Sequence, residues 1–164
     1  MTTIGITGHI RLRPPNPRLV LAELVRLLSA QPAPHGVTCL AEGSDRLFAE
    51  ALQACGGTFD VVLPVPADLP DPESDRELRS LLASARDVTR VAEPGPPEAS
   101  YEIASSIVVE RCDLLIAVWD GTSAGVRGGT AETVAWARAM DKPVQVVWPA
   151  GARRGVTVAP VPVG

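Results

Sequence analysis

The 164-residue chain has few cysteines, little excess charge and no long hydrophobic run. Its three cysteines, Cys39, Cys55 and Cys112, are odd in number, lie in or beside apolar segments and lack the spacing of metal ligands. They predict reduced core thiols in a cytoplasmic protein, with no metal site and no cofactor. No apolar stretch is long enough to span a bilayer, and no basic region with a signal core opens the chain, so we expect no membrane partner.

Positive charge is also scarce. The formal net charge is -4, and lysines and arginines are scattered apart from the pair Arg153 and Arg154. A surface for a long polyanion needs clustered positive charge, so the composition predicts no nucleic-acid partner. With 46% hydrophobic residues the chain can bury one good core. We expect a single domain over residues 1–150 and a loose tail over residues 151–164.

Strand and helix patterns alternate along the chain. The run Leu114–Trp119 is apolar without polar alternation, as in a strand covered on both faces. The other predicted strands are Thr2–Thr7, Val37–Ala41, Phe59–Val65, Val88–Ala92 and Pro143–Trp148. The predicted helices are Arg18–Ala30, with Asn16 as N-cap, and Asp45–Cys55, Glu73–Ala85, Pro97–Arg111 and Ala131–Met140. This alternation predicts an α/β fold, a doubly wound and mainly parallel Rossmann-like sheet of about six strands with helices on both faces.

Glycine and polar residues follow three of the predicted strands. The first strand runs into Thr7-Gly8-His9, the second into Glu42-Gly43-Ser44-Asp45, and the fifth into Asp120-Gly121. The amino ends of the strands carry no comparable set. Because ligands of open α/β sheets bind beyond the carboxyl ends of the strands, near the reversal of strand order, the sequence predicts a binding cleft there.

The connection after the fifth strand is the richest in glycine. It contains Gly121, Gly125, Gly128 and Gly129, and Thr130 is the predicted N-cap of the next helix. Several glycines in one connection indicate backbone amides presented to an anion, and phosphate is the expected one. Glu132, in the first helical turn, would repel a phosphate beside it, which places it nearer a ribose.

Each of these elements also has a structural interpretation. Gly8 can serve a tight turn, and His9 can be a loop residue bonded to the backbone. Ser44 or Asp45 can cap a helix, and Asp120 can stabilise an Asp-Gly turn or hold ribose hydroxyls. Trp119 and Trp136 favour a core position over a stacking role.

Three segments, ITGH near the start, LAEGSDRLFAEAL after the second strand and AVWDG followed by GGTAETVAWA, resemble the SLOG superfamily of Rossmann-like nucleotide-binding domains. This superfamily includes the Lonely guy phosphoribohydrolases and DNA-processing protein A. The resemblance covers residues 4 to 148 and implies a nucleotide or nucleotide-derived ligand. It also implies a homodimer, formed through helices that flank the glycine-rich loop.

The chain departs from the enzymes of that superfamily. Lonely guy enzymes carry the pattern PGGxGTxxE. In this chain the threonine follows the two glycines directly, without the intervening residue and glycine, and Thr133 stands where the glutamate would be. Glu132 is one position early, a rotation of about 100° on a helix. Many relatives read ITGHR, but here Ile10 takes the place of the arginine and Arg11 follows it.

Two functions remain as hypotheses from the sequence. The first is a module that binds a nucleoside phosphate or an ADP-ribose-like compound; the second is a phosphoribohydrolase in which Glu132 or Asp120 is catalytic. A scaffold without a ligand is a further alternative. The predicted ligand-binding residues are Thr7, Gly8, His9, Arg11, Gly43, Ser44, Asp45, Asp120, Gly121, Gly128, Gly129, Thr130 and Glu132.

Overall fold

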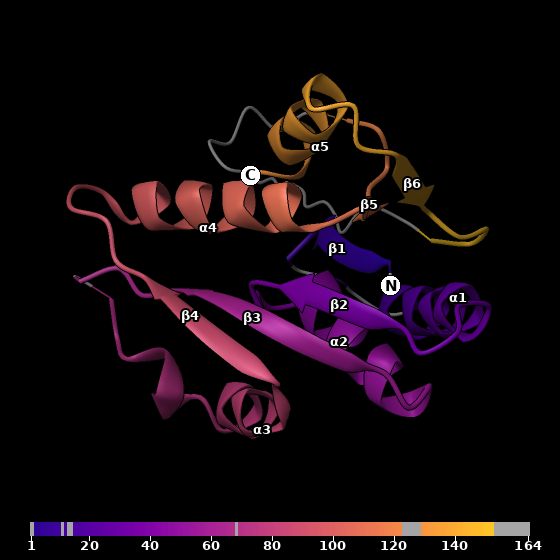
Figure 1. The fold of residues 1–164 in the computed structure, drawn as a ribbon, viewed down its shortest axis with the longest axis horizontal. Helices are drawn as coiled ribbons and strands as arrows, with labels where there is room; N and C mark the ends of the chain where they lie inside the picture. Colours follow the sequence, from indigo (N-terminus) through magenta and orange to yellow (C-terminus); the bar gives the residue numbers. More distant parts are fainter. Residues whose placement is uncertain (1, 11, 13–14, 68, 123–128, 153–164) are drawn as a thin grey trace, which may run out of the picture.

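The structure is a computed structural model that describes residues 2–10, 12, 15–67, 69–122 and 129–152 (Figure 1). The strands are β1 (Thr3–Gly8), β2 (His35–Thr38), β3 (Thr58–Pro64), β4 (Asp87–Val91), β5 (Leu114–Val118) and β6 (Val144–Val147). The helices are α1 (Asn16–Ser29), α2 (Ser44–Ala54), α3 (Arg76–Ser84), α4 (Pro97–Arg111) and α5 (Thr130–Ala139), with a short 3-10 turn η1 (Pro72–Ser74) before α3. The predicted tail falls almost entirely outside the described residues.

The six strands form one sheet in the order β4-β3-β2-β1-β5-β6, and every neighbouring pair is parallel. The predicted doubly wound α/β fold is therefore confirmed. The chain moves outward from β1 to β4, then crosses back to place β5 on the other side of β1. The strand order thus reverses between β1 and β5, where the register pairs Gly8 with Val118. Open sheets of this kind bind ligands beyond the strand ends at such a point.

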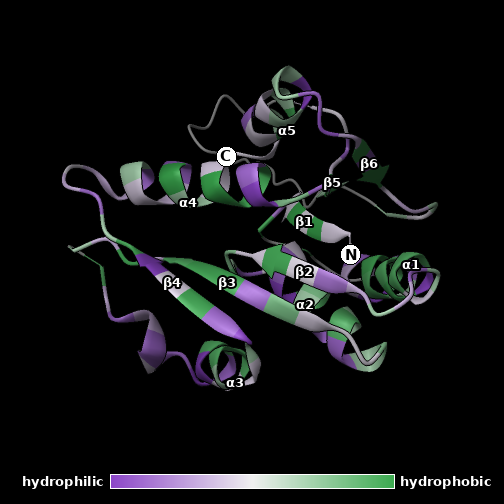
Figure 2. Ribbon diagram, in the orientation of Figure 1, coloured by the Kyte–Doolittle hydropathy of each residue, from purple (hydrophilic) through white to green (hydrophobic). Residues whose placement is uncertain are grey.

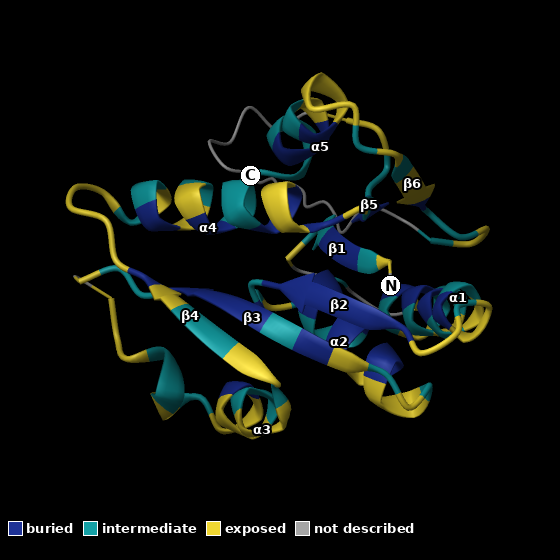
Figure 3. Ribbon diagram, in the orientation of Figure 1, coloured by how far each residue is buried: buried dark blue, intermediate teal, exposed yellow. Residues whose placement is uncertain are grey.

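Helices cover both faces of the sheet. Figure 1 shows α1, α2 and α3 on one face and α4 and α5 on the other. Successive residues of β5 point to opposite faces, so Leu115 packs under α4 and α5 while Ile116 packs under α1 and α2. This explains the continuous apolar run of β5, whereas the edge strand β4 alternates between green and purple in Figure 2. The edge strands β4 and β6 are more exposed than the central strands (Figure 3).

Several helix starts differ from the sequence-based prediction. Asn16 was expected to cap α1 but is its first helical residue and is buried, and Pro15 is the N-cap. The helix predicted over Glu73–Ala85 is interrupted, because the Asp75 carboxylate accepts hydrogen bonds from the amides of Glu77 and Leu78 and so starts α3 there. An aspartate that bonds the next amides competes with a continuous helix. In place of the one predicted helix, the structure has the short turn η1 and the helix α3.

The end of β2 also differs from its prediction. The strand was expected over Val37–Ala41 but ends at Thr38. Leu40 has a φ of 56°, in the left-handed region that strands do not use, and its amide is bonded to the Thr38 hydroxyl. The early end of β2 turns the chain into the loop that begins α2. Among the described helices, none is long and apolar enough to cross a membrane.

Candidate functional site at the carboxyl edge of the sheet

His9 and Asp120 face each other where the strand order reverses. His9 follows β1, and its amide donates to the carbonyl oxygen of Val118, the last residue of β5. Its Nε2 atom lies 3.5 Å from Oδ1 of Asp120 and 3.4 Å from the Asp120 amide nitrogen. Both side chains are mostly buried, at 18% and 12% exposed. The structure thus brings together two of the predicted site residues.

Asp120 is held in place by its own turn. Its Oδ1 accepts hydrogen bonds from the amide and the hydroxyl of Thr122, at 3.0 and 2.7 Å. The indole nitrogen of Trp119 donates to the Thr122 carbonyl oxygen at 2.7 Å. Asp120 therefore does stabilise an Asp-Gly turn, in which Gly121 is exposed. The same bonds orient the carboxylate at the strand end, so the structural role and a role in ligand binding are compatible.

Trp148 places its aromatic ring beside His9. It follows β6, and its ring meets the imidazole edge-on with 5.4 Å between centroids. The sequence-based selection missed this residue, although the rule that identified the other strand ends applies to β6 as well. Trp119 and Trp136, predicted to be core residues, are only partly buried.

Gly8 allows α2 to approach β1 closely. A side chain at this position would place its Cβ 2.6 Å from the Ser44 hydroxyl oxygen and 2.8 Å from the Val118 Cβ. Gly8 lies in the extended strand, so it serves close packing and not the tight turn that was considered. Ser44 is fully buried and donates from its hydroxyl to the carbonyl oxygen of His9 at 3.0 Å. Thr7 lies one residue earlier in β1 and is partly buried.

Gly43 begins α2 in a conformation that other residues adopt at a cost. Its φ is 86°, and a Cβ there would lie 2.6 Å from the carbonyl oxygen of Ile10. Gly43 is the N-cap residue, and no side chain caps this helix. The hypothesis that Ser44 or Asp45 caps α2 is therefore wrong, since both are already inside the helix and bond elsewhere.

Asp45 is buried and holds the loop that precedes it. It is 7% exposed, and its Oδ2 accepts from the Ala41 amide at 3.2 Å. Burial raises the pKa of Asp45 to about 7, against the lowering effect of hydrogen bonds from Ala41, Cys39 and Thr38. Because these partners lie at the end of β2 and in the loop that follows it, the Asp45 carboxylate holds that segment and, like the buried Ser44, is directed into the protein.

The start of α5 supplies the remaining described residues. Gly129, not Thr130 as predicted, is the N-cap, and the helix has no side-chain cap. Thr130 is the first helical residue, and Glu132 lies half-buried in the first turn. Thr133 is buried, with its hydroxyl bonded to the Gly129 carbonyl oxygen at 3.0 Å. Arg11, Gly125 and Gly128 lie outside the described residues.

A groove of about 510 Å³ opens beside this site, along the loops that follow β1 and β2. It shares Gly43 with the predicted residues, but its other walls were not predicted. Four carboxylates and one guanidinium line it. The lining residues are Ile10, Leu12, Pro17, Glu42, Gly43, Arg46, Leu47, Glu50, Asp75 and Glu77.

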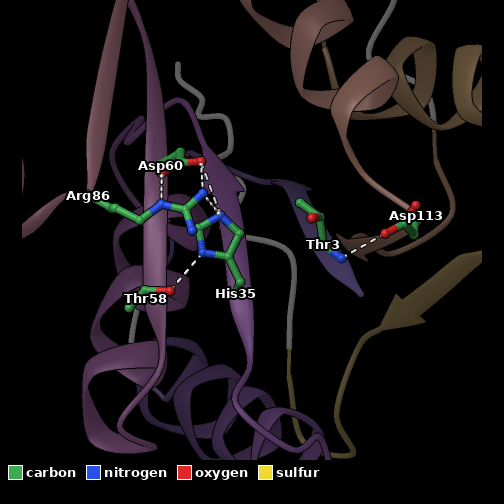
Figure 4. A network of polar contacts seen from close by, with 6 residues as sticks. All are labelled: Thr3, His35, Thr58, Asp60, Arg86 and Asp113. Carbon is green, nitrogen blue, oxygen red and sulfur yellow. Dashed lines mark hydrogen bonds and ion pairs between the residues drawn. The ribbon is translucent and has the colours of Figure 1, made fainter. Parts of the chain in front are cut away.

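A polar network stands at the opposite edge of the sheet, where none was expected (Figure 4). His35 is buried at the start of β2; its Nδ1 lies 2.7 Å from the Thr58 hydroxyl and its Nε2 3.1 Å from Oδ2 of Asp60. Arg86 donates to both oxygens of Asp60. The prediction that the amino ends carry no comparable polar set is therefore wrong. His35 lies outside the strands predicted from the sequence, and the network forms only when β2, β3 and the start of β4 align.

The three cysteines are all free thiols, and Cys112 is buried. Burial raises the pKa of the Cys39 and Cys112 thiols, so neither is an activated nucleophile. In the described ranges, no three His, Cys, Asp or Glu side chains are grouped to hold a metal ion.

Solved structures of other proteins share this fold. DNA processing protein A from Streptococcus pneumoniae matches 92% of this chain at 18% identity with a TM-score of 0.66, and the chain spans 51% of that protein. The same protein from Helicobacter pylori matches 92% of the chain at 18% identity, with a TM-score of 0.67 and 67% of its own length covered. The molybdenum cofactor carrier protein from Chlamydomonas reinhardtii matches 88% at 19% identity, with a TM-score of 0.58 and 75% of its own length covered.

The chain thus shares its Rossmann-like fold with these proteins, and the fold that the sequence resemblance implied is confirmed. No protein-family model matches the sequence, and no curated protein matches it significantly.

The comparisons correct one prediction. Nucleic acid was excluded as a partner from the net charge, but the Helicobacter pylori protein of this fold is described by its single-stranded DNA binding mode. Net charge is a sum over the whole molecule, whereas binding depends on where charges and backbone donors lie. A net charge of -4 therefore does not exclude such a partner.

Proposed function

We propose that this protein binds a nucleotide or a nucleotide-derived ligand, such as a nucleoside phosphate or an ADP-ribose-like compound, at the carboxyl edge of its sheet. One observation carries the proposal: His9 and Asp120 lie together at the reversal of strand order, the place where Rossmann-like sheets hold such ligands. Asp120 is oriented by Thr122, as a carboxylate that accepts ribose hydroxyls must be.

The phosphate would lie at the start of α5. A helix N-terminus without a side-chain cap offers backbone donors and a positive dipole end to an anion. Gly129 at the N-cap lets the anion approach the backbone closely. Glu132 in the same turn favours a neutral group of the ligand beside it, such as the ribose.

One neighbouring structure supports the binding of a small ligand by this fold. The Chlamydomonas reinhardtii protein is named as a carrier of the molybdenum cofactor. A carrier holds its ligand without chemical change, which is the behaviour that we propose here.

No observation favours the phosphoribohydrolase alternative. Thr133 occupies the position of the glutamate in the PGGxGTxxE pattern, and it is buried against the Gly129 carbonyl oxygen. Substitution of Glu132 by alanine separates the two functions. An enzyme would lose base release while it retains the ligand, whereas a binding protein has no turnover to lose.

Thermal unfolding with AMP, ADP, ATP, GMP, CMP, NAD and ADP-ribose tests the proposal. A ligand at about a hundredfold its dissociation constant stabilises the native state by roughly 2.7 kcal/mol, which corresponds to a Tm shift of several degrees. We expect a shift with at least one compound of the panel. If every compound leaves Tm unchanged, the proposed function is wrong.

A further inference from the structure

The groove beside the site has an apolar floor. Ile10, Leu12, Pro17 and Leu47 line it, and the Ile10 side chain is 57% exposed. A large aliphatic side chain that exposed, next to three other apolar residues, is an uncovered apolar surface. Leu12 and Leu47 also pack on the core beneath the groove, which makes the floor continuous with the protein interior.

The rim of the groove is acidic. Glu42, Glu50, Asp75 and Glu77 contribute four carboxylates, and Glu42 and Glu50 are exposed. These two take no part in any ion pair identified among the described residues.

Among the described lining residues one is a cation, Arg46, and it is already engaged. Nη1 of Arg46 lies 2.9 Å from Oδ2 of Asp75 and 3.8 Å from Oε1 of Glu77, and its Nε donates to the Leu40 carbonyl oxygen at 3.1 Å. The guanidinium is mostly buried, at 12% exposed. Arg46 thus links α2 to the start of α3, and the described charges that remain for an incoming ligand are those of the carboxylates.

We propose that this groove docks a segment of another protein that presents an aliphatic side chain flanked by lysine or arginine. The aliphatic group would cover Ile10 and Leu47, and the cations would pair with Glu42 and Glu50. Charge complementarity selects this occupant, because an acidic segment would be repelled from the rim and a purely polar one would leave the floor uncovered. This docking does not depend on the proposed nucleotide site.

Fluorescence anisotropy with three labelled peptides tests the inference. The probe is KRLLRK, and its partners are KRSSRK, which lacks the aliphatic pair, and EDLLDE, which reverses the charge. We expect KRLLRK to bind, KRSSRK to bind at least tenfold more weakly because the floor stays uncovered, and EDLLDE not to bind. If KRLLRK and KRSSRK bound equally, the peptides would be held by their charge alone, and the proposal would be overturned.

Matched variants of the full chain locate the binding. Ile10→Ser and the double variant Glu42→Gln with Glu50→Gln should each weaken KRLLRK binding at least threefold. The control variants Ile103→Ser and Glu110→Gln change an exposed isoleucine and an exposed glutamate on α4, on the opposite face, and should leave binding unchanged. If KRLLRK does not bind, or if the groove variants and the controls weaken it equally, the groove is not its docking surface.

Discussion

Nε2 of His9 lies 3.5 Å from Oδ1 of Asp120, although the two residues are 111 positions apart in the sequence. Each follows a central strand, and parallel pairing of β1 with β5 brings the two strand ends together. This pair marks the reversal of strand order, and it is the element of the site from which the main prediction follows.

Asp120→Asn should reduce the stabilisation by a ligand of the panel. The amide presents one acceptor in place of two and carries no charge, so hydrogen bonds to ribose hydroxyls weaken, by about 1.5–3 kcal/mol for a charged acceptor. The measurement is the ligand-induced shift of Tm. Asp113→Asn is the matched control, because Asp113 precedes the same strand at the opposite edge, where it accepts from the Thr3 amide (Figure 4). If the ligand-induced shift of Tm were the same in the two variants, Asp120 would not be a ligand-binding residue.

Gly8→Ala should destabilise the fold although the change adds a single methyl group. The new Cβ would lie 2.6 Å from the Ser44 hydroxyl oxygen and 2.7 Å from its Cβ, so β1 and α2 must move apart. Overpacking of this kind costs about 1–3 kcal/mol, which urea unfolding measures. Ser44→Ala in the same background should recover part of the loss, since it removes the nearer of the two atoms. Wild-type stability of Gly8→Ala would show that the contact is easily relieved.

The contribution of Asp45 to the free energy of unfolding should fall as pH rises from about 4 to 7. Burial raises the pKa of Asp45 from 3.8 to about 7, so the native state keeps a proton that the unfolded state releases in this range. The expected slope for one group is at most about 1.4 kcal/mol per pH unit. Asp45→Asn should remove this contribution.

Urea unfolding of the wild type and Asp45→Asn at pH 5, 6, 7 and 8 gives the difference directly. The stability of the variant relative to the wild type should improve with pH. Asp87→Asn, at an exposed position on β4, is the control and should show no such trend. A difference between Asp45→Asn and the wild type that is the same at every pH would contradict the buried titration.

Asp60→Ala should cost about 1–3 kcal/mol of stability at pH 7, because it leaves the buried His35 and the exposed Arg86 without their common acceptor (Figure 4). Burial acts to raise the pKa of Asp60, but hydrogen bonds and charge from Arg86 and His35 outweigh it and lower the pKa below 3.8. The stabilisation is therefore present above pH 3.8 and lost as pH falls below it. Urea unfolding at pH 7 measures the loss.

Glu73→Ala provides the comparison for Asp60→Ala. Glu73 pairs with Arg90 at 2.9 Å, but both side chains are nearly half exposed. Exposed pairs contribute about 0–1 kcal/mol, so this variant should be close to the wild type. If the two variants lost equal stability, the His35 network would contribute no more than a surface ion pair.

The elements themselves were predictable, because each depends on local pattern. The helix Pro97–Arg111 was predicted with the bounds that the structure has, and the apolar run at Leu114 was correctly assigned to a strand buried on both faces. The predicted boundaries were wrong where a single residue decides where an element begins or ends. Asp75 starts α3 by binding two amides, and Leu40 ends β2 by a positive φ. Neither effect has a pattern that spans several residues.

The candidate site was predictable in part. Strand ends marked by glycine identified His9 and Asp120, and parallel pairing then placed them together. Ser44 and Asp45 were included by the same rule, yet both point into the protein. Their direction depends on how α2 packs on β1, which the strand-end rule does not contain.

The sequence by itself determined the class of the fold and placed His9 and Asp120 at one edge of the sheet, because hydrophobic periodicity and glycine position are local properties of the chain. The tertiary structure alone decided three other features: that Trp148 stands beside His9, that His35 joins Asp60 and Arg86, and that Ile10 floors an acidic groove. Each of these brings together residues from separate strands or loops. Their distances follow from the strand order and from the packing of helices on the sheet, which no short segment of sequence encodes.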